Sequence, residues 1–174
     1  MTNRNLKGGF FIKQFKPFII PILFLTLIDQ IIKIFISRLF IQDEFDIISH
    51  VLRFNPEHNT NLSWFGNFFD IFSHSFIMVV FNILAIYIFI SGYLLYRAKT
   101  NQTGFSVKII MVCGLTGCLC SLIDKLFWGG SLDFLQIPNF FTFDIKDCYL
   151  TVAGIVFVII GMLHSEEITI KEYL

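Results

Sequence analysis

The sequence predicts an all-α membrane protein with four transmembrane helices and a small β-containing cap on the extracytoplasmic side. Two observations predict this fold class. Hydrophobic residues make up 55% of the 174 residues and the mean hydropathy is +0.72, more than a water-soluble domain of this length requires. Four long apolar segments are also separated by polar stretches. The formal net charge is zero, so bulk electrostatics gives no reason to expect a nucleic-acid partner.

The apolar segments cover about residues 17–39, 75–96, 107–126 and 148–163. A hydrocarbon layer about 30 Å thick requires ~20 helical residues, so three segments are long enough and the fourth is short. Helices are expected because each backbone amide in lipid must find a partner within its own segment. We expect residues 1–174 to form a single integral membrane domain.

Lysine and arginine positions predict the orientation of these helices. Four basic residues precede the first segment and three flank the connection after the second, whereas the other connections carry mainly acids. We therefore expect both termini in the cytoplasm and residues 40–74 and 127–147 on the outer side. The basic start imitates a signal peptide, but no small-residue cleavage site follows, so we expect an uncleaved helix.

Residues 40–74 form the expected cap. Their β-branched and aromatic residues are interrupted by Asn and Pro, which is typical of short strands and turns rather than of a helix. Trp64 and Phe65 suit the headgroup level of the bilayer, where aromatic side chains collect.

Charged residues also lie within or next to the apolar segments. Asp29 and Lys33 are four residues apart, on one helix face, and can pair. Such a pair is either a buried clamp between helices or a contact to a substrate. Asp124 and Lys125 end the third segment, where they either mark the water boundary or, for Asp124, orient a neighbouring backbone or basic group.

Asp133 and Asp147 are the candidate catalytic pair. Asp133 follows a Gly-Gly turn and Asp147 opens the fourth segment, so a folded-back connection would bring them together. Two close carboxylates in a poorly hydrated place share one proton, and such a pair can activate water and protonate a leaving group. By proximity alone, Asp144 or Lys146 is an equally good partner, and scattered solvent-facing acids are the simpler interpretation.

The same residues resemble the sequence blocks of the lipoprotein signal peptidases (signal peptidase II), four-span aspartic proteases of the bacterial cytoplasmic membrane. "DQIIK" (29–33) resembles D-Q-x-x-K, "NTNLSW" (59–64) resembles N-x-G-A-A-F, and "TGCLCSLIDK" (116–125) resembles G-G-A-L-G-N-L-I-D-R. "GGSLDF" (129–134) is similar to G-x-V-V-D-F, and "FDIKD" (143–147) to F-N-x-A-D. The blocks occur in the family's order across nearly the whole chain, which makes the resemblance specific.

The resemblance implies catalytic roles for Asp133 and Asp147. It implies substrate-binding or supporting roles for Asp29, Lys33, Asn59, Asn61, Trp64, Ser121, Asp124, Lys125 and Asp144. Asn59 is the preferred match to the family Asn of the outer block, and Asn61 is the alternate.

Three departures from the blocks carry chemistry. Ser121 and Asp144 each stand where the family has Asn, and Lys125 replaces an Arg with its bidentate fork. Asp144 thus adds a third acid near the pair.

The resemblance further implies cleavage of diacylglyceryl-modified prolipoproteins just before the lipidated Cys, with no metal or other cofactor. The expected partners are the prolipoprotein substrate and membrane lipids, and a monomer is expected. Two alternatives stay open. One is a diverged relative that binds lipoprotein precursors without cutting them. The other is a non-enzymatic membrane protein such as a transporter subunit, although a transporter would place its acids near the bilayer midplane.

Overall fold

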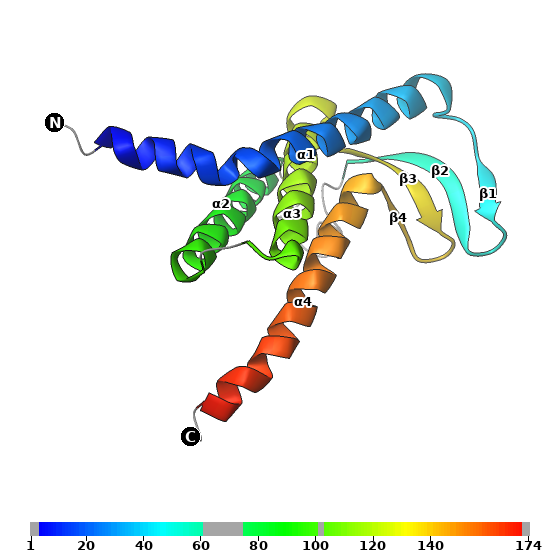
Figure 1. Ribbon diagram of the computed structural model, residues 1–174. Coiled ribbons are helices and arrows are strands. Elements are labelled where there is room, and N and C mark those ends of the chain that lie inside the picture. Colours follow the sequence, from blue (N-terminus) through cyan, green and yellow to red (C-terminus); the bar gives the residue numbers. More distant parts are fainter. Residues whose placement is uncertain (1–3, 61–74, 101–102, 172–174) are drawn as a thin grey trace.

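Four helices and a four-stranded sheet make up the fold (Figure 1). The computed structural model describes residues 4–60, 75–100 and 103–171, with side chains between residues 14 and 163 of these ranges. The helices are α1 (Arg4–Leu39), α2 (Ser75–Lys99), α3 (Phe105–Ile123) and α4 (Ile145–Lys171), and a π-helical turn, η3 (Asp124–Trp128), continues α3. Helix α3 is central, because it contacts α1, α2 and α4.

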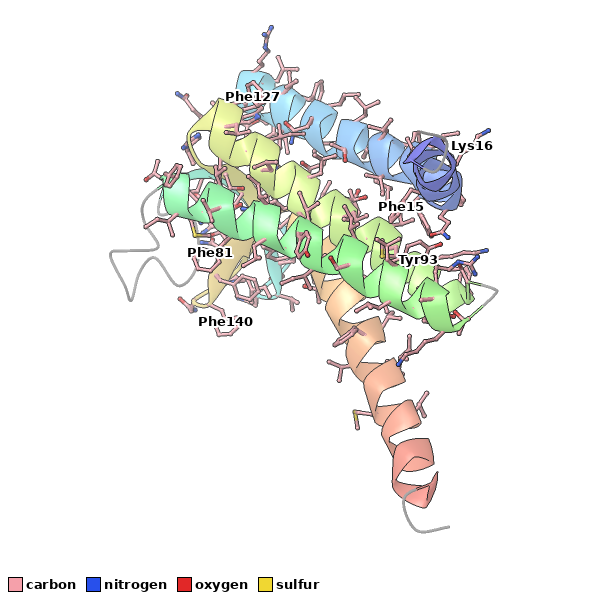
Figure 2. The ribbon with its side chains drawn as sticks, turned by 90° about the vertical axis from the view of Figure 1, so that its left-hand side faces the viewer. Phe15, Lys16, Phe81, Tyr93, Phe127 and Phe140 are labelled. Carbon is pink, nitrogen blue, oxygen red and sulfur yellow. The ribbon has the colours of Figure 1, made fainter. Side chains whose placement is uncertain are left out.

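The helices present an apolar outer surface. Within the described residues, four helical stretches are long and apolar enough to cross a membrane, namely Gln14–Leu39, Phe76–Lys99, Phe105–Trp128 and Ile145–Leu163. Ile20, Phe76 and Phe157 are 76%, 78% and 66% exposed, and Figure 2 shows Phe81 and Phe127 on the outside as well. Large apolar side chains on all sides of a helical bundle suit a lipid environment. The predicted four-helix membrane fold with a small sheet is therefore confirmed.

The helix ends differ from the apolar segments read in the sequence. Helix α1 begins at Arg4 rather than near residue 17, and α4 begins at Ile145 rather than at residue 148. Hydropathy does not register the polar residues of a first helical turn, which is why the fourth segment looked short. Its span, Ile145–Leu163, has 19 residues and matches the ~20 that a bilayer requires.

The sheet is antiparallel throughout and has the order β1-β2-β3-β4. Its strands are β1 (Phe45–Ile48), β2 (Leu52–Asn59), β3 (Ser131–Ile137) and β4 (Phe141–Phe143). Strands β1 and β2 lie in the segment where the sequence predicts strands. Strands β3 and β4 come from the connection between α3 and α4, for which the sequence predicted only a folded-back loop.

Two glycines carry the chain from η3 into β3. Gly129 has a φ of +66°, which an L side chain rarely adopts. A β-carbon at Gly130 would lie 2.6 Å from the backbone oxygen of Asn59. The close approach puts the start of β3 directly against the end of β2, where Ser131 is the register partner of Asn59.

Two apolar clusters hold the helices and the sheet together. Phe18, Tyr93 and Met111 belong to one cluster, which joins α1, α2 and α3. Ile36 of α1 packs with Leu132 and Phe134 of β3 in the other. Along α1, the polar stretch that contains Asp29 and Lys33 lies between these two clusters.

Candidate active site

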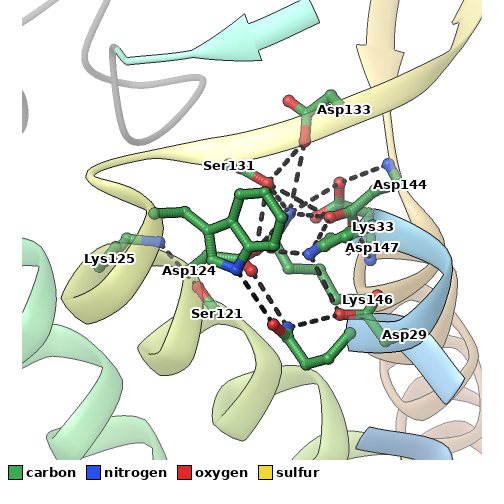
Figure 3. A network of polar contacts seen from close by, with 12 residues as sticks. Asp29, Lys33, Ser121, Asp124, Lys125, Ser131, Asp133, Asp144, Lys146 and Asp147 are labelled. Atoms are coloured by element: carbon green, nitrogen blue, oxygen red, sulfur yellow. Dashed lines mark hydrogen bonds and ion pairs between the residues drawn. The ribbon is translucent and has the colours of Figure 1, made fainter. Parts of the chain in front are cut away.

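A cluster of polar side chains, all buried except that of Asp147, lies where α1, η3, β3 and the start of α4 meet (Figure 3). Its members are Asp29, Lys33, Asp124, Ser131, Asp133, Asp144, Lys146 and Asp147. The cluster thus places five carboxyl groups around two ammonium groups. Buried charges are costly unless they are paired, so the contacts among these groups determine whether the fold tolerates them.

Lys33 joins three carboxylates from three parts of the chain. Its Nζ lies 3.1 Å from Asp29 Oδ2, 2.6 Å from Asp124 Oδ2 and 2.7 Å from Asp144 Oδ2, and the side chains are fully buried. The pairing of Asp29 with Lys33 that the helix spacing predicted is present. Because Asp124 ends α3 and Asp144 precedes α4, Lys33 also acts as a clamp between helices.

Asp124 and Lys125 do not mark a water boundary. Asp124 is 0% exposed and Lys125 is 7% exposed. Asp124 instead contacts a basic group, because its Oδ2 lies 2.6 Å from Lys33 Nζ. Lys125 donates a hydrogen bond of 2.8 Å from Nζ to Ser121 Oγ. Both residues differ from the family block at their positions.

Gln30 and Trp128 are supporting residues that the sequence reading missed. Gln30 Nε2 donates to Asp29 Oδ2 at 3.0 Å and to Asp124 Oδ1 at 3.3 Å. Its amide oxygen accepts from Trp128 Nε1 at 3.1 Å. Gln30 is the second residue of "DQIIK", so its place in this block was a reason to include it among the supporting residues.

Asp133 and Asp147 come together from β3 and the first turn of α4. One carboxylate oxygen each of Asp133, Asp144 and Asp147 lies within 4.8 Å of the others. Asp133 accepts hydrogen bonds on both oxygens, from Asn59 Nδ2 at 2.9 Å and from Ser131 Oγ at 2.8 Å. An ionised carboxylate can accept on both oxygens in this way.

Asp144 and Asp147 cap the start of α4 reciprocally. The backbone N–H of Asp147 donates to Asp144 Oδ1, and the backbone N–H of Asp144 donates to Asp147 Oδ2, both at 3.2 Å. This is the arrangement of a capping box, in which the residue before the helix and the third helical residue satisfy each other. The box fixes the Asp147 side chain, which is 41% exposed, while that of Asp133 is 6% exposed.

Lys146 is the main residue that the sequence reading left without a role. Its Nζ donates at 2.6 Å to both Ser131 Oγ and Asp144 Oδ2. It lies 3.5 Å from Asp133 Oδ1 and 3.7 Å from Asp147 Oδ2. A lysine in the first turn of a helix opposes the helix dipole. A lysine at this unfavourable position is a reason to expect carboxylates around it.

The charges around Asp144 set its protonation. Burial by itself raises the pKa of Asp144, but the ammonium groups of Lys146 and Lys33 outweigh this effect and hold that pKa below its ordinary value. The oxygens of Asp133, Asp144 and Asp147 are spaced closely enough to hold a metal ion. The Lys146 ammonium lies among the same oxygens and already supplies positive charge there.

The outer block of the sequence is described only in part. Asn59 contacts Asp133 as given above, whereas Asn61 and Trp64 lie outside the described residues. The paired carboxyl groups, one held by two donors and one more open to water, have the composition that acid–base hydrolysis of a peptide bond requires.

Proteins similar to this chain are signal peptidases. The family model of signal peptidase (SPase) II matches residues 21–164. The lipoprotein signal peptidases of Staphylococcus aureus strains JH9 and Newman are each 26% identical to the chain over 148 residues, covering 82% of the chain and 85% of the relative.

Two solved structures of bacterial membrane enzymes have a similar fold. The first has a TM-score of 0.67 at 24% identity, over 87% of this chain and 91% of the other. The second has a TM-score of 0.61 at 25% identity, over 85% of this chain and 93% of the other.

Proposed function

The chain belongs to the signal peptidase II family, and we propose that it removes signal peptides from lipid-modified prolipoproteins with Asp133 and Asp147 as its catalytic residues. It is a peptidase of aspartic type and a multi-pass membrane protein. The observation that carries the catalytic assignment is the approach of the two carboxyl groups, whose oxygens lie within 4.8 Å although they belong to different elements.

Asp133 is the general base of the proposed reaction. Its two oxygens accept hydrogen bonds from Asn59 and Ser131, which suits the ionised form. Asp147 then holds the proton that the pair shares, because two close carboxylates do not both ionise cheaply. Asp147 is the more exposed of the two, so it is the group that can reach a substrate carbonyl.

The reaction needs one water molecule and no covalent intermediate. Asp133 removes a proton from water, whose oxygen attacks the scissile carbonyl carbon while Asp147 donates a hydrogen bond to the carbonyl oxygen. The C–N bond then breaks, and the leaving amine takes up a proton from the pair. The products are a new carboxylate on the signal peptide and a free amino terminus on the lipoprotein, so the carboxyl pair returns to its starting state.

The site lies at the ends of the spans. Asp133 follows the span that ends at Trp128, and Asp147 lies in the first turn of the span that begins at Ile145. The end of α1 and the start of α4 both lie beside the sheet (Figure 1). Together with the basic residues on the opposite connections, this supports cytoplasmic termini and a site at the outer face. A substrate whose signal helix lies in the bilayer would then reach the site laterally.

Cleavage by purified enzyme in lipid tests the proposal. The substrate is a diacylglyceryl-modified prolipoprotein, and the readout is its shift on a gel. Asp133→Asn and Asp147→Asn are expected to insert and fold but to leave the substrate uncut. Asp46→Asn, which changes a half-exposed acid on β1, is the matched control and should cut normally.

The outcomes of this assay separate the alternatives. Normal cleavage by either variant at Asp133 or Asp147 would remove that residue from the catalytic assignment. A wild-type protein that binds the prolipoprotein without cutting it would support the diverged, non-catalytic alternative instead.

A further inference from the structure

Three polar residues of this chain stand at positions where the family blocks have Val, Asn and Ala. They are Ser131 in "GGSLDF", and Asp144 and Lys146 in "FDIKD". The structure brings all three into mutual contact. Lys146 Nζ lies 2.6 Å from Ser131 Oγ and 2.6 Å from Asp144 Oδ2, and Ser131 Oγ lies 3.2 Å from Asp144 Oδ2. Departures that are separate in the sequence thus form one group in space.

We propose that Lys146 is a positioning residue for the catalytic pair, and that Ser131 and Asp144 hold its ammonium group between Asp133 and Asp147. The inference rests on the function proposed above. It assigns to Lys146 the control of the pH range in which the pair carries a single proton.

The Lys146 ammonium group contacts both members of the catalytic pair. Its Nζ lies 3.5 Å from Asp133 Oδ1 and 3.7 Å from Asp147 Oδ2. A positive charge at this range favours the ionised form of a carboxyl group. The ammonium group therefore stabilises a negative charge on the pair, which an uncharged side chain at this position would not do.

The Ser131 hydroxyl group links Lys146 to Asp133. Ser131 Oγ accepts a hydrogen bond from Lys146, so its single hydrogen is left for a carboxylate. Among the carboxylates within reach, Asp133 Oδ1 is the nearest, at 2.8 Å, with Asp124 and Asp144 at 3.1 and 3.2 Å. Lys146 thus also acts on Asp133 through Ser131.

Lys146 is surrounded by charged groups, and its side chain is only 7% exposed. The charged groups that face it from the elements packed against it are Lys33 of α1, Asp124 and Lys125 of η3, Asp133 of β3, and Asp144 and Asp147 at the start of α4. Carboxylates outnumber ammonium groups in this set, which keeps Lys146 charged. Asp144 is its nearest carboxylate and offsets part of its effect on the pair.

A set of single and double variants tests the inference through the pH dependence of kcat/KM, which reports the ionisations of the free enzyme. Lys146→Met removes the positive charge, so both limbs of the profile should move to higher pH by about 1 pH unit or more. Asp144→Asn removes a negative charge, so the limbs should move to lower pH. Asp144→Asn combined with Lys146→Ala should fall between the two, and Lys146→Arg, which keeps the charge, should keep the wild-type profile.

Opposite shifts that cancel in the double variant are not expected from a structural role alone. Coincident profiles for the wild type, Lys146→Met and Lys146→Arg would overturn the inference, whatever happens to stability. If Lys146→Met does not fold, Asp144→Asn is compared with the double variant, which differs from it only at residue 146. The double variant should then have its profile at higher pH, and equal profiles would overturn the inference.

The same assay separates this inference from the proposed function. If the wild type cleaves its substrate but the profiles coincide, only the role of Lys146 fails. If the wild type does not cleave, or if Asp133→Asn and Asp147→Asn both cleave at the wild-type rate, the proposed function itself fails.

Discussion

Asp144 and Asp147 hold each other at the start of α4, where each carboxylate accepts the backbone N–H of the other residue at 3.2 Å. The contact has a structural and a chemical consequence. It satisfies two backbone donors at the helix start, and it fixes the side chain that we propose to donate a hydrogen bond to the substrate carbonyl. The family block has Asn at position 144, and an Asn side chain can accept the same hydrogen bond.

The cap predicts a difference between two substitutions of Asp144. Asp144→Asn keeps an accepting oxygen and should still cleave prolipoprotein, although with an altered pH profile. Asp144→Ala removes the oxygen as well as the charge, so it should be about 1 kcal/mol less stable than Asp144→Asn because of the lost N-cap, and it should slow cleavage because Asp147 is no longer fixed. Thermal unfolding and initial cleavage rates measure both effects. Equal loss of activity in the two variants would contradict a role for the cap.

The clamp at Lys33 predicts a large loss of stability. Lys33→Met leaves Asp29, Asp124 and Asp144 as buried acids without their common cation, which should cost about 3–5 kcal/mol. The matched control on the same helix is Lys16→Met, at an exposed lysine, where a change within ~0.5 kcal/mol is expected. Denaturant unfolding in a membrane mimic compares the two, and similar stabilities would show that the clamp does not stabilise the fold.

The amide of Asn59 predicts a loss of activity without unfolding. Asn59→Ala removes the donor to Asp133 Oδ2 at 2.9 Å. A hydrogen bond to a charged group contributes about 1.5–3 kcal/mol, so kcat should fall by roughly 10- to 100-fold. Asn82→Ala is the control, because the Asn82 amide donates within α2 to the Met78 carbonyl. A rate in Asn59→Ala equal to that in Asn82→Ala would remove Asn59 from the site.

The close contact at Gly130 predicts that a single methyl group disturbs the site. In Gly130→Ala the new β-carbon would meet the Asn59 backbone oxygen at 2.6 Å, so β2 and β3 must move apart and carry Asn59 away from Asp133. Cleavage should fall and the melting temperature should drop. Gly154→Ala on α4, where a β-carbon meets nothing within 4 Å, should be neutral or slightly stabilising. The prediction fails if both alanine variants behave like the wild type.

The fold was predictable because its main signal is local. Four apolar segments and the need to satisfy backbone amides in lipid are enough to predict the helices. The spacing of Asp29 and Lys33 likewise predicts their pairing, which the structure contains. Strands β3 and β4 were not predicted, although "SLDFLQI" largely alternates polar and apolar residues. The pairing of β3 with β2 is long-range, and β4 pairs with β3.

The site was less predictable for the same physical reason. Proximity in the sequence could not decide whether Asp133, Asp144 or Lys146 is the partner of Asp147. In the structure all three lie close to the Asp147 carboxylate. Ser131 was not predicted to belong to the site, because a serine in a turn is common. Its hydroxyl group nevertheless contacts three carboxylates and one ammonium group. Contacts of this kind depend on the meeting of four elements and leave no periodic pattern.

The most direct test of the central claim is the initial rate of prolipoprotein cleavage by Asp133→Asn, Asp147→Asn and the double variant in one reconstituted system. Two carboxyl groups that work as a unit predict that each single variant loses about 10²- to 10⁴-fold in rate and that the double variant is no slower than the singles. A single variant that cleaves at the wild-type rate, or a double variant whose loss is the product of two small separate losses, would contradict the account.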